Sequence, residues 1–155
     1  MLTTGQPDAV AYIRGDAAHT RLNGIVKFYQ LRRGVLVEAE IMGLPNDTAS
    51  CAPNIFAMHI HEYGRCSGNT KDAFADVGMH YNPQKCAHPA HAGDLPPLFG
   101  NHGYAWGAVF TERFQVADVL GRSVIVHAGL DDFTSQPAGN AGQKIGCGVI
   151  RPARP

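Results

Sequence analysis

Short stretches in which apolar and polar residues alternate recur along the chain, and residues that favour turns separate them. Alternation with a period of two, rich in β-branched residues, is typical of strands that bury one face. Helical periodicity is scarce, and only 115–120 fits a single helical turn. The pattern therefore predicts an all-β fold, a Greek-key antiparallel β-sandwich or barrel of about eight strands. The expected strands span 9–14, 25–31, 35–42, 54–61, 104–110, 123–127 and 146–150.

Two segments, 63–97 and 128–144, are too long and too rich in glycine, proline and asparagine to be hairpin turns. Long connections in a compact domain are usually either functional or disordered. Because five candidate metal ligands lie inside or beside these segments, we expect two functional loops.

Two further expectations concern the strands themselves. Tyr104, Trp106, Val109 and Phe110 are interpreted as core rather than as a partner surface, because apolar residues on an alternating strand are more often buried. The last residues, 151–155, are expected to fray.

Composition and charge narrow the class of protein. The chain has 155 residues, 45 % apolar and 17 % charged, which predicts one globular domain over 1–155. Thirteen basic residues balance thirteen acidic ones, so neither nucleic acid nor an anionic membrane is an expected partner. No stretch approaches the roughly 20 apolar residues of a membrane span. The N-terminus lacks the basic and apolar regions of a signal peptide, so the sequence as it stands predicts a cytoplasmic location.

Six of the eight histidines, together with one aspartate, form a ligand list typical of a two-metal site. The pair at positions 59 and 61 can present both imidazoles to one ion, because alternate residues of a strand point to the same side. The seven candidates are His59, His61, His80, His88, His91, Asp94 and His127.

Five motifs, taken in order, carry a resemblance to a known family. They are HIHE at 59–62, GMHYNP at 78–83, HAGDLP at 91–96, GRSVIVH at 121–127 and GNAGQKIGCGVI at 139–150. In order and over nearly the whole chain, they resemble copper/zinc superoxide dismutases, here of a bacterial type with shortened loops. The resemblance implies an enzyme that disproportionates superoxide, with copper and zinc as cofactors.

The resemblance divides the ligands into two sets that share His80 as a bridge and catalytic residue. We call His59, His61, His80 and His127 the four-histidine set, which would hold copper, and His80, His88, His91 and Asp94 the mixed set, which would hold zinc. Imidazole suits copper, and three nitrogens with one oxygen suit tetrahedral zinc. His88 lies closer to His91 than the family usually places this ligand; the alternative is a surface histidine with zinc weakly bound or absent.

Two charged residues complete the site that the resemblance implies. Asp131 matches an aspartate that orients one histidine of each set; the alternative is an aspartate that caps a loop. Lys144 stands where the family usually carries an arginine, and a lysine still attracts a small anion although it lacks the guanidinium fork. We therefore expect superoxide as the substrate and a reduced but surviving activity.

The four cysteines form no CxxC pair, so a cysteine-rich zinc site is not expected. The resemblance pairs Cys66 with Cys147 in a disulfide. Cys51 and Cys86 have no counterpart in it and are either a second bridge or two free thiols. Two bridges would suit an oxidising, extracytoplasmic compartment, which is the alternative to the cytoplasm.

Two properties stay open at the level of the sequence. Family members are often dimers, so the resemblance implies a homodimer as the oligomer to test. Different branches of the family use different faces, so the resemblance does not indicate which residues would form the interface. The alternative function is a metal buffer, a copper- and zinc-binding protein of the same fold without turnover.

Overall fold

Strands dominate the regular structure of residues 5–154, the part of the chain that the computed structural model describes. The all-β prediction is confirmed, and the short helix α1 lies in the segment expected to form one turn. The elements are β1 (Ala9–Gly15), β2 (Asn23–Gln30), β3 (Val35–Met42), β4 (Ile55–Phe56), β5 (Met58–His61), the 3₁₀ turn η1 (Ala75–Val77), β6 (Leu98–Phe99), β7 (Ala105–Thr111), α1 (Val116–Val119), β8 (Ser123–His127) and β9 (Lys144–Pro152).

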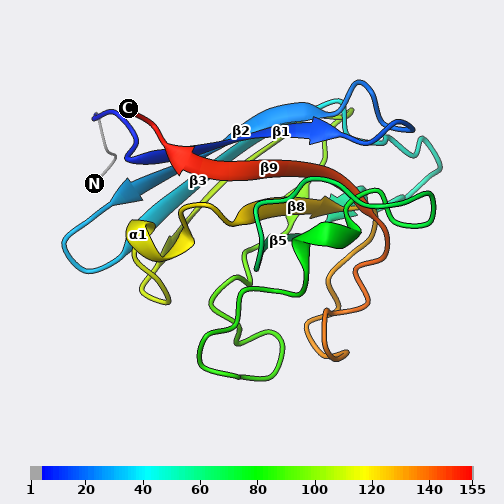
Figure 1. Cartoon of the computed structure of the whole chain (residues 1–155). Coiled ribbons are helices and arrows are strands. Elements are labelled where there is room, and N and C mark those ends of the chain that lie inside the picture. Colours follow the sequence, from blue (N-terminus) through cyan, green and yellow to red (C-terminus); the bar gives the residue numbers. More distant parts are fainter. Residues whose placement is uncertain (1–4, 155) are drawn as a thin grey trace.

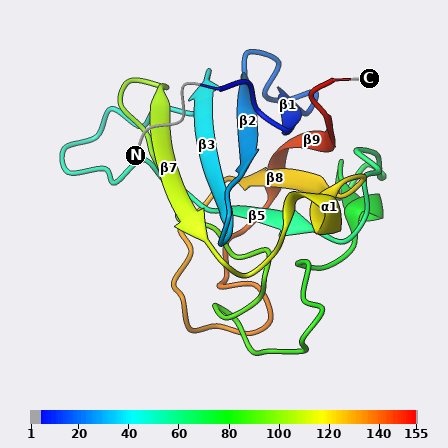
Figure 2. The same ribbon diagram turned by 90° about the vertical axis from the view of Figure 1, so that its left-hand side faces the viewer.

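Seven strands form one antiparallel sheet in the order β5-β8-β9-β1-β2-β3-β7, and β4 pairs with β6. Within it, β9 returns late in the chain to lie beside β1 of the β1-β2-β3 meander, which is a Greek-key order. The sheet curls strongly, so that β5 and β8 cross below the upright strands β7, β3 and β2 in Figure 2. The curl gives the sheet an inner face.

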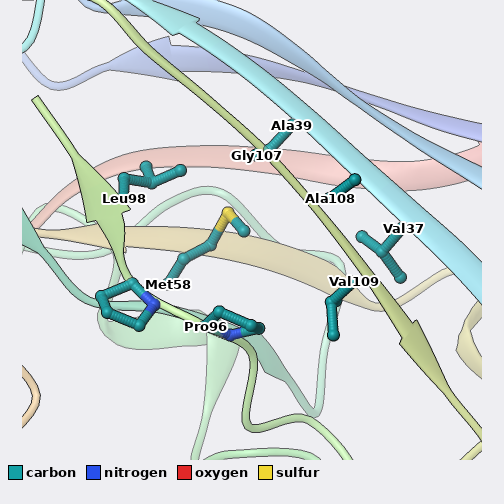
Figure 3. A pocket seen from close by; sticks show the side chains of 9 residues that line it. Val37, Ala39, Met58, Pro96, Leu98, Gly107, Ala108 and Val109 are labelled. Carbon is teal, nitrogen blue, oxygen red and sulfur yellow. The ribbon is translucent and has the colours of Figure 1, made fainter.

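The inner face is apolar because alternate residues of each strand point into it. In β3, for example, Val35, Val37, Ala39 and Ile41 are buried, and the residues between them are more exposed. A small cavity of about 80 Å³ remains between β3, β7 and the Met58 side chain (Figure 3). Met58 adapts to such gaps because its side chain is unbranched and flexible.

Three expectations about the strands are wrong in detail. Trp106, Phe110 and Tyr104 are 54 %, 50 % and 42 % exposed, because the residues of β7 that point inward are the small or aliphatic ones between them. The strand expected at 54–61 is divided into β4 and β5. The C-terminal segment is not frayed at its start, since β9 runs to Pro152 and pairs there with β1.

The two long loops hang from the same side of the sheet (Figure 1). Cys66 in the first loop is joined to Cys147 in β9 by a disulfide that spans 81 positions. Cys51 and Cys86 are free, so the second bridge is not formed; Cys51 is exposed in the segment before β4. Among residues 5–154, no helix is both long and apolar enough to cross a membrane.

Candidate metal centre

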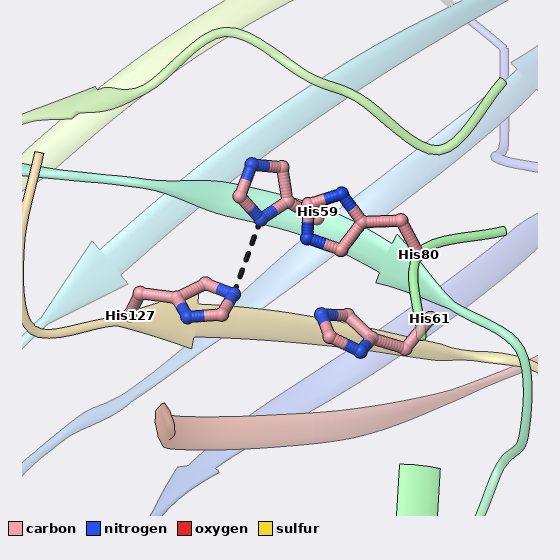
Figure 4. Close-up of side chains that lie close together, drawn as sticks. All are labelled: His59, His61, His80 and His127. Carbon is pink, nitrogen blue, oxygen red and sulfur yellow. Dashed lines mark hydrogen bonds between the residues drawn. The ribbon is translucent and has the colours of Figure 1, made fainter. Parts of the chain in front are cut away.

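Two adjacent strands and one loop bring the four-histidine set together. His59 and His61 both lie in β5, His127 ends the neighbouring strand β8, and His80 forms an isolated bridge with His61. All four side chains are buried, and their donor atoms lie within 4.8 Å of one another. Figure 4 shows the four rings gathered around one point.

Hydrogen bonds outside the set decide which nitrogen each ring presents. The Nδ1 atom of His61 lies 2.9 Å from the carbonyl of Gly78, and Nδ1 of His127 lies 3.2 Å from the carbonyl of Gly142. A carbonyl accepts only, so each Nδ1 carries the proton and each Nε2 keeps its lone pair. This is the tautomer that a metal ligand needs.

The other two members, His59 and His80, present different nitrogens to the centre: Nδ1 of His59 and Nε2 of His80. His59 uses its Nε2 atom to bond Asp131 at 2.8 Å, which leaves Nδ1 for the centre, 3.1 Å from Nε2 of His127. Nε2 of His61 and Nε2 of His80 are buried without any hydrogen-bond partner. Buried polar atoms without partners are rare, so these lone pairs fit a site that binds a cation.

The mixed set gathers around the other nitrogen of His80. Its Nδ1 atom lies 2.9 Å from Oδ1 of Asp94 and 3.2 Å from Nδ1 of His91. Nδ1 of His88 lies 3.0 Å from Oδ2 of Asp94, but the two atoms lack hydrogen-bond geometry. Donor atoms of His80, His88 and Asp94, together with one of His59, lie within 4.8 Å of one another. His91 lies 3.2 Å from His80 and 3.3 Å from Asp94 but stands outside that group. Imidazole nitrogens with one carboxylate are donors that zinc prefers. His88 is 3 % exposed, so the structure does not place it at the surface.

Asp131 joins the two sets through its two carboxylate oxygens. Oδ2 lies 2.8 Å from Nε2 of His59, and Oδ1 lies 2.8 Å from Nε2 of His88. The carboxylate is buried and also accepts a bond from the N–H of Phe133. It therefore orients one ring in each set.

Burial fixes the charge state of the site. Desolvation lowers the pKa of His127 to about 4 and also lowers the pKa values of His59, His61 and His91. Burial acts to raise the pKa of Asp94, but the hydrogen bond with His80 and the charge interactions with His80, His88 and His91 together outweigh burial, and the pKa is lowered. At neutral pH these four rings are neutral and the carboxylate is ionised, as metal binding requires.

Lys144 begins β9 beside the four-histidine set, and its positive charge contributes to the lowered pKa values of His61 and His127. Its Nζ atom donates to Oδ2 of Asp72, in the first long loop, at 2.5 Å. The sequence predicted that Lys144 lies near the site, but it did not predict the contact with Asp72. Polar residues in loops follow no periodic pattern from which their partners could be inferred.

Comparison with known proteins agrees with this geometry. The family model of copper/zinc superoxide dismutase matches residues 22–150. An extracellular superoxide dismutase of the rabbit Oryctolagus cuniculus is 34 % identical over 155 residues, which cover 90 % of this chain and 59 % of that protein. A superoxide dismutase of Aquifex aeolicus (strain VF5) is 34 % identical over 144 residues, covering 83 % and 78 %. A copper chaperone for superoxide dismutase from Rattus norvegicus is 32 % identical over 156 residues, covering 92 % and 52 %.

The fold and the site define a β-barrel protein with two joined metal-binding sets. The chain belongs to the copper/zinc superoxide dismutase family. Family and donor sets together support copper and zinc as its cofactors. The chain spans less than two thirds of the rabbit relative and about half of the rat chaperone.

Proposed function

We propose that the protein is a superoxide dismutase that converts two superoxide anions and two protons into O₂ and H₂O₂. The observation that supports this function most strongly is the complete four-histidine set, joined through His80 to His88 and Asp94 of the mixed set. When bound, copper supplies one-electron exchange with superoxide, and zinc, which keeps one oxidation state, supplies structure.

His80 has the position that this reaction needs for a proton carrier. Its Nε2 atom, toward the four-histidine set, is buried and unpaired, and its Nδ1 atom lies 2.9 Å from Oδ1 of Asp94 in the mixed set. We infer that Nε2 takes up a proton in one half-reaction and gives it up in the other. The proton then goes to the superoxide that is reduced.

Lys144 supplies the positive charge that an anionic substrate needs near the four-histidine set. Its effect on the pKa values of two rings of that set supports this role. The bond to Asp72 offsets part of the charge and also holds the ammonium group in place. Lys144 therefore contributes both attraction and orientation.

The test is the decay of superoxide after pulse radiolysis, with protein loaded with copper and zinc and with metal-free protein. We expect a fast, catalytic rate that depends on copper and is absent from the metal-free protein. A loaded protein that leaves the decay of superoxide unchanged would contradict the proposed function.

The second candidate is a metal buffer that binds copper and zinc without turnover. Two observations favour it: the similarity to a copper chaperone and the pairing of the Lys144 charge with Asp72. The same pulse-radiolysis experiment separates the two, because a buffer with copper bound would not accelerate the decay.

A further inference from the structure

The part of the mixed set closest to the surface is a short segment, residues 87–91, which we call the zinc segment. It turns both of its histidine rings inward, while Pro89 and Ala90 are exposed. Within the segment, the backbone forms one hydrogen bond, from the N–H of Ala90 to the carbonyl of Ala87 at 2.8 Å. One internal bond cannot fix the two rings, so the restraint has to come from neighbouring parts of the chain.

Gln136, in the second long loop, bonds both backbone groups of His88. The N–H of His88 donates to Oε1 of Gln136 at 2.8 Å, and Nε2 of Gln136 donates to the carbonyl of His88 at 2.7 Å. The same Nε2 atom donates to the carbonyl of Thr134 at 3.1 Å, which fixes the amide within its own loop. Since Asp131 of this loop holds the His88 ring, the backbone and the ring are held from one side.

Arg113, just after β7, holds the other half of the zinc segment. Its Nη1 atom donates to the carbonyl of Pro89 at 2.9 Å and to the carbonyl of His91 at 3.1 Å. A guanidinium group keeps its donors in a rigid plane and stays charged, so it suits two carbonyls at a fixed spacing. The N–H of His91 donates to Oδ2 of Asp94, so Asp94 holds the backbone nitrogen of His91 and Arg113 holds its carbonyl group.

We propose that Gln136 and Arg113 are positioning residues that hold His88 and His91 in the geometry of the zinc site. This inference rests on the proposed function, because it assumes that the mixed set binds zinc. Outer partners of metal ligands typically change metal affinity by about 10- to 100-fold when they are removed. Both residues are exposed and touch no ligand atom of either set, so they act through the backbone.

The test is zinc affinity, measured by competition with a chromophoric chelator on the whole protein. Gln136→Met keeps the length of the side chain and removes both bonds to His88; we expect zinc affinity to fall about tenfold. Arg113→Met should give a similar loss, and Arg113→Lys should recover part of it. Ser135→Ala is the matched control, because this neighbouring hydroxyl bonds Asp132 and not the zinc segment.

Two further measurements separate positioning from general stability. Amide exchange followed by NMR should become faster at His88 in Gln136→Met, while the urea midpoint of the metal-free protein should match that of Ser135→Ala. With cobalt(II) in place of zinc, the visible bands of the tetrahedral site should shift in Gln136→Met and stay unchanged in Ser135→Ala. Zinc affinities of the Gln136→Met and Arg113→Met variants within twofold of the wild type would overturn the proposal. A wild-type protein that binds no zinc would overturn it together with the zinc site of the proposed function.

Discussion

Lys144 has two contacts of opposite effect, one with the site and one with Asp72. Its positive charge contributes to the lowered pKa values of His61 and His127. Oδ2 of Asp72 lies 2.5 Å from its Nζ atom, and this carboxylate weakens the positive field that a superoxide anion would meet. The pKa of Asp72 is lowered: burial acts to raise it, but the hydrogen bonds from Lys144 and from the N–H of Phe74, together with the charge of Lys144, outweigh burial. The carboxylate of Asp72 is therefore ionised at neutral pH and offsets the positive charge beside it.

Asp72→Asn should raise the rate of superoxide decay at low ionic strength. Removing one negative charge beside Lys144 strengthens the attraction of an anion, and we expect about a twofold higher rate with a steeper dependence on salt. Asp76→Asn is the control, since Asp76 lies in the same loop and bonds Ser67 instead. A slower Asp72→Asn enzyme would mean that orientation of Lys144 matters more than its free charge.

Lys144→Ala should lower the rate of superoxide decay and flatten its dependence on ionic strength. The other charges of the second loop are Asp131, which is buried against two histidines, and Asp132, which bonds its own loop. Neither attracts an anion, so steering depends largely on Lys144. An unchanged rate and salt slope in the pulse-radiolysis experiment would contradict this prediction.

The clustering of the candidate metal ligands was predictable because their spacing reflects the geometry of one strand and several ordered motifs. Side chains that act across loops were not: Asp72, Gln136 and Arg113 make their contacts to residues far away along the chain. Polar residues in loops have no periodicity, and only a three-dimensional arrangement shows which backbone groups they reach.

At the scale of elements, strands were predictable where the two faces differ in polarity. In β3 the apolar residues alternate with more polar ones, and the sequence shows directly which face is inside. In β7 both faces are apolar or small, so alternation cannot tell the inner face from the outer one. The large aromatic residues were assigned to the core, but the curl of the sheet leaves room only for the smaller set.

The inner face of β7 offers a stabilising substitution. A Cβ atom at Gly107 would meet no heavy atom within 4 Å, and this position lines the cavity of about 80 Å³. Gly107→Ala should therefore stabilise the fold by about 0.5–1 kcal/mol, because it restricts the unfolded chain. Gly148→Ala is the contrasting variant, since its Cβ would lie 2.5 Å from the carbonyl oxygen of Tyr12; it should destabilise by about 1–3 kcal/mol. Urea unfolding of the metal-free protein checks both signs.

The disulfide joins the first long loop to β9 and should contribute strongly to stability. In the chain-entropy relation, a crosslink between residues 81 positions apart contributes at most about 4.5 kcal/mol. Urea unfolding with and without a reductant measures the difference. The Cys51→Ser/Cys86→Ser variant should show the same difference, because neither thiol is paired. Equal midpoints with and without reductant would contradict this expectation.

At the scale of the whole molecule, the sheet carries a buried group of neutral histidines on its outer side, under two loops. Neutral rings in a buried site make the metal-free fold sensitive to acid, because the unfolded chain binds protons that the folded chain excludes. Metal binding removes this sensitivity, since ligand nitrogens that hold a metal cannot be protonated.

The metal-free protein should lose stability as the pH falls from about 6.5 to about 4. The pKa of His127 is lowered to about 4 by burial, so above pH 6.5 the ring is neutral in both states, and below it only the unfolded ring is charged. At about 1.4 kcal/mol per pKa unit, His127 alone would account for about 3 kcal/mol, as an order of magnitude. Urea unfolding at several pH values tests this, and His127→Gln should reduce the slope.

The place of β1 in the sheet also determines when the barrel can form during synthesis. β1 has β2 on one side, which follows it directly, but its other neighbour is β9, with Ala11 opposite Ile150. Contacts between residues so far apart in sequence make folding slow. Until β9 is in place, β1 exposes one open edge, and β8, which ends at His127, lacks one of its two neighbouring strands. Completion of the metal centre is therefore expected to wait for β9, a strand that carries none of the seven candidate ligands.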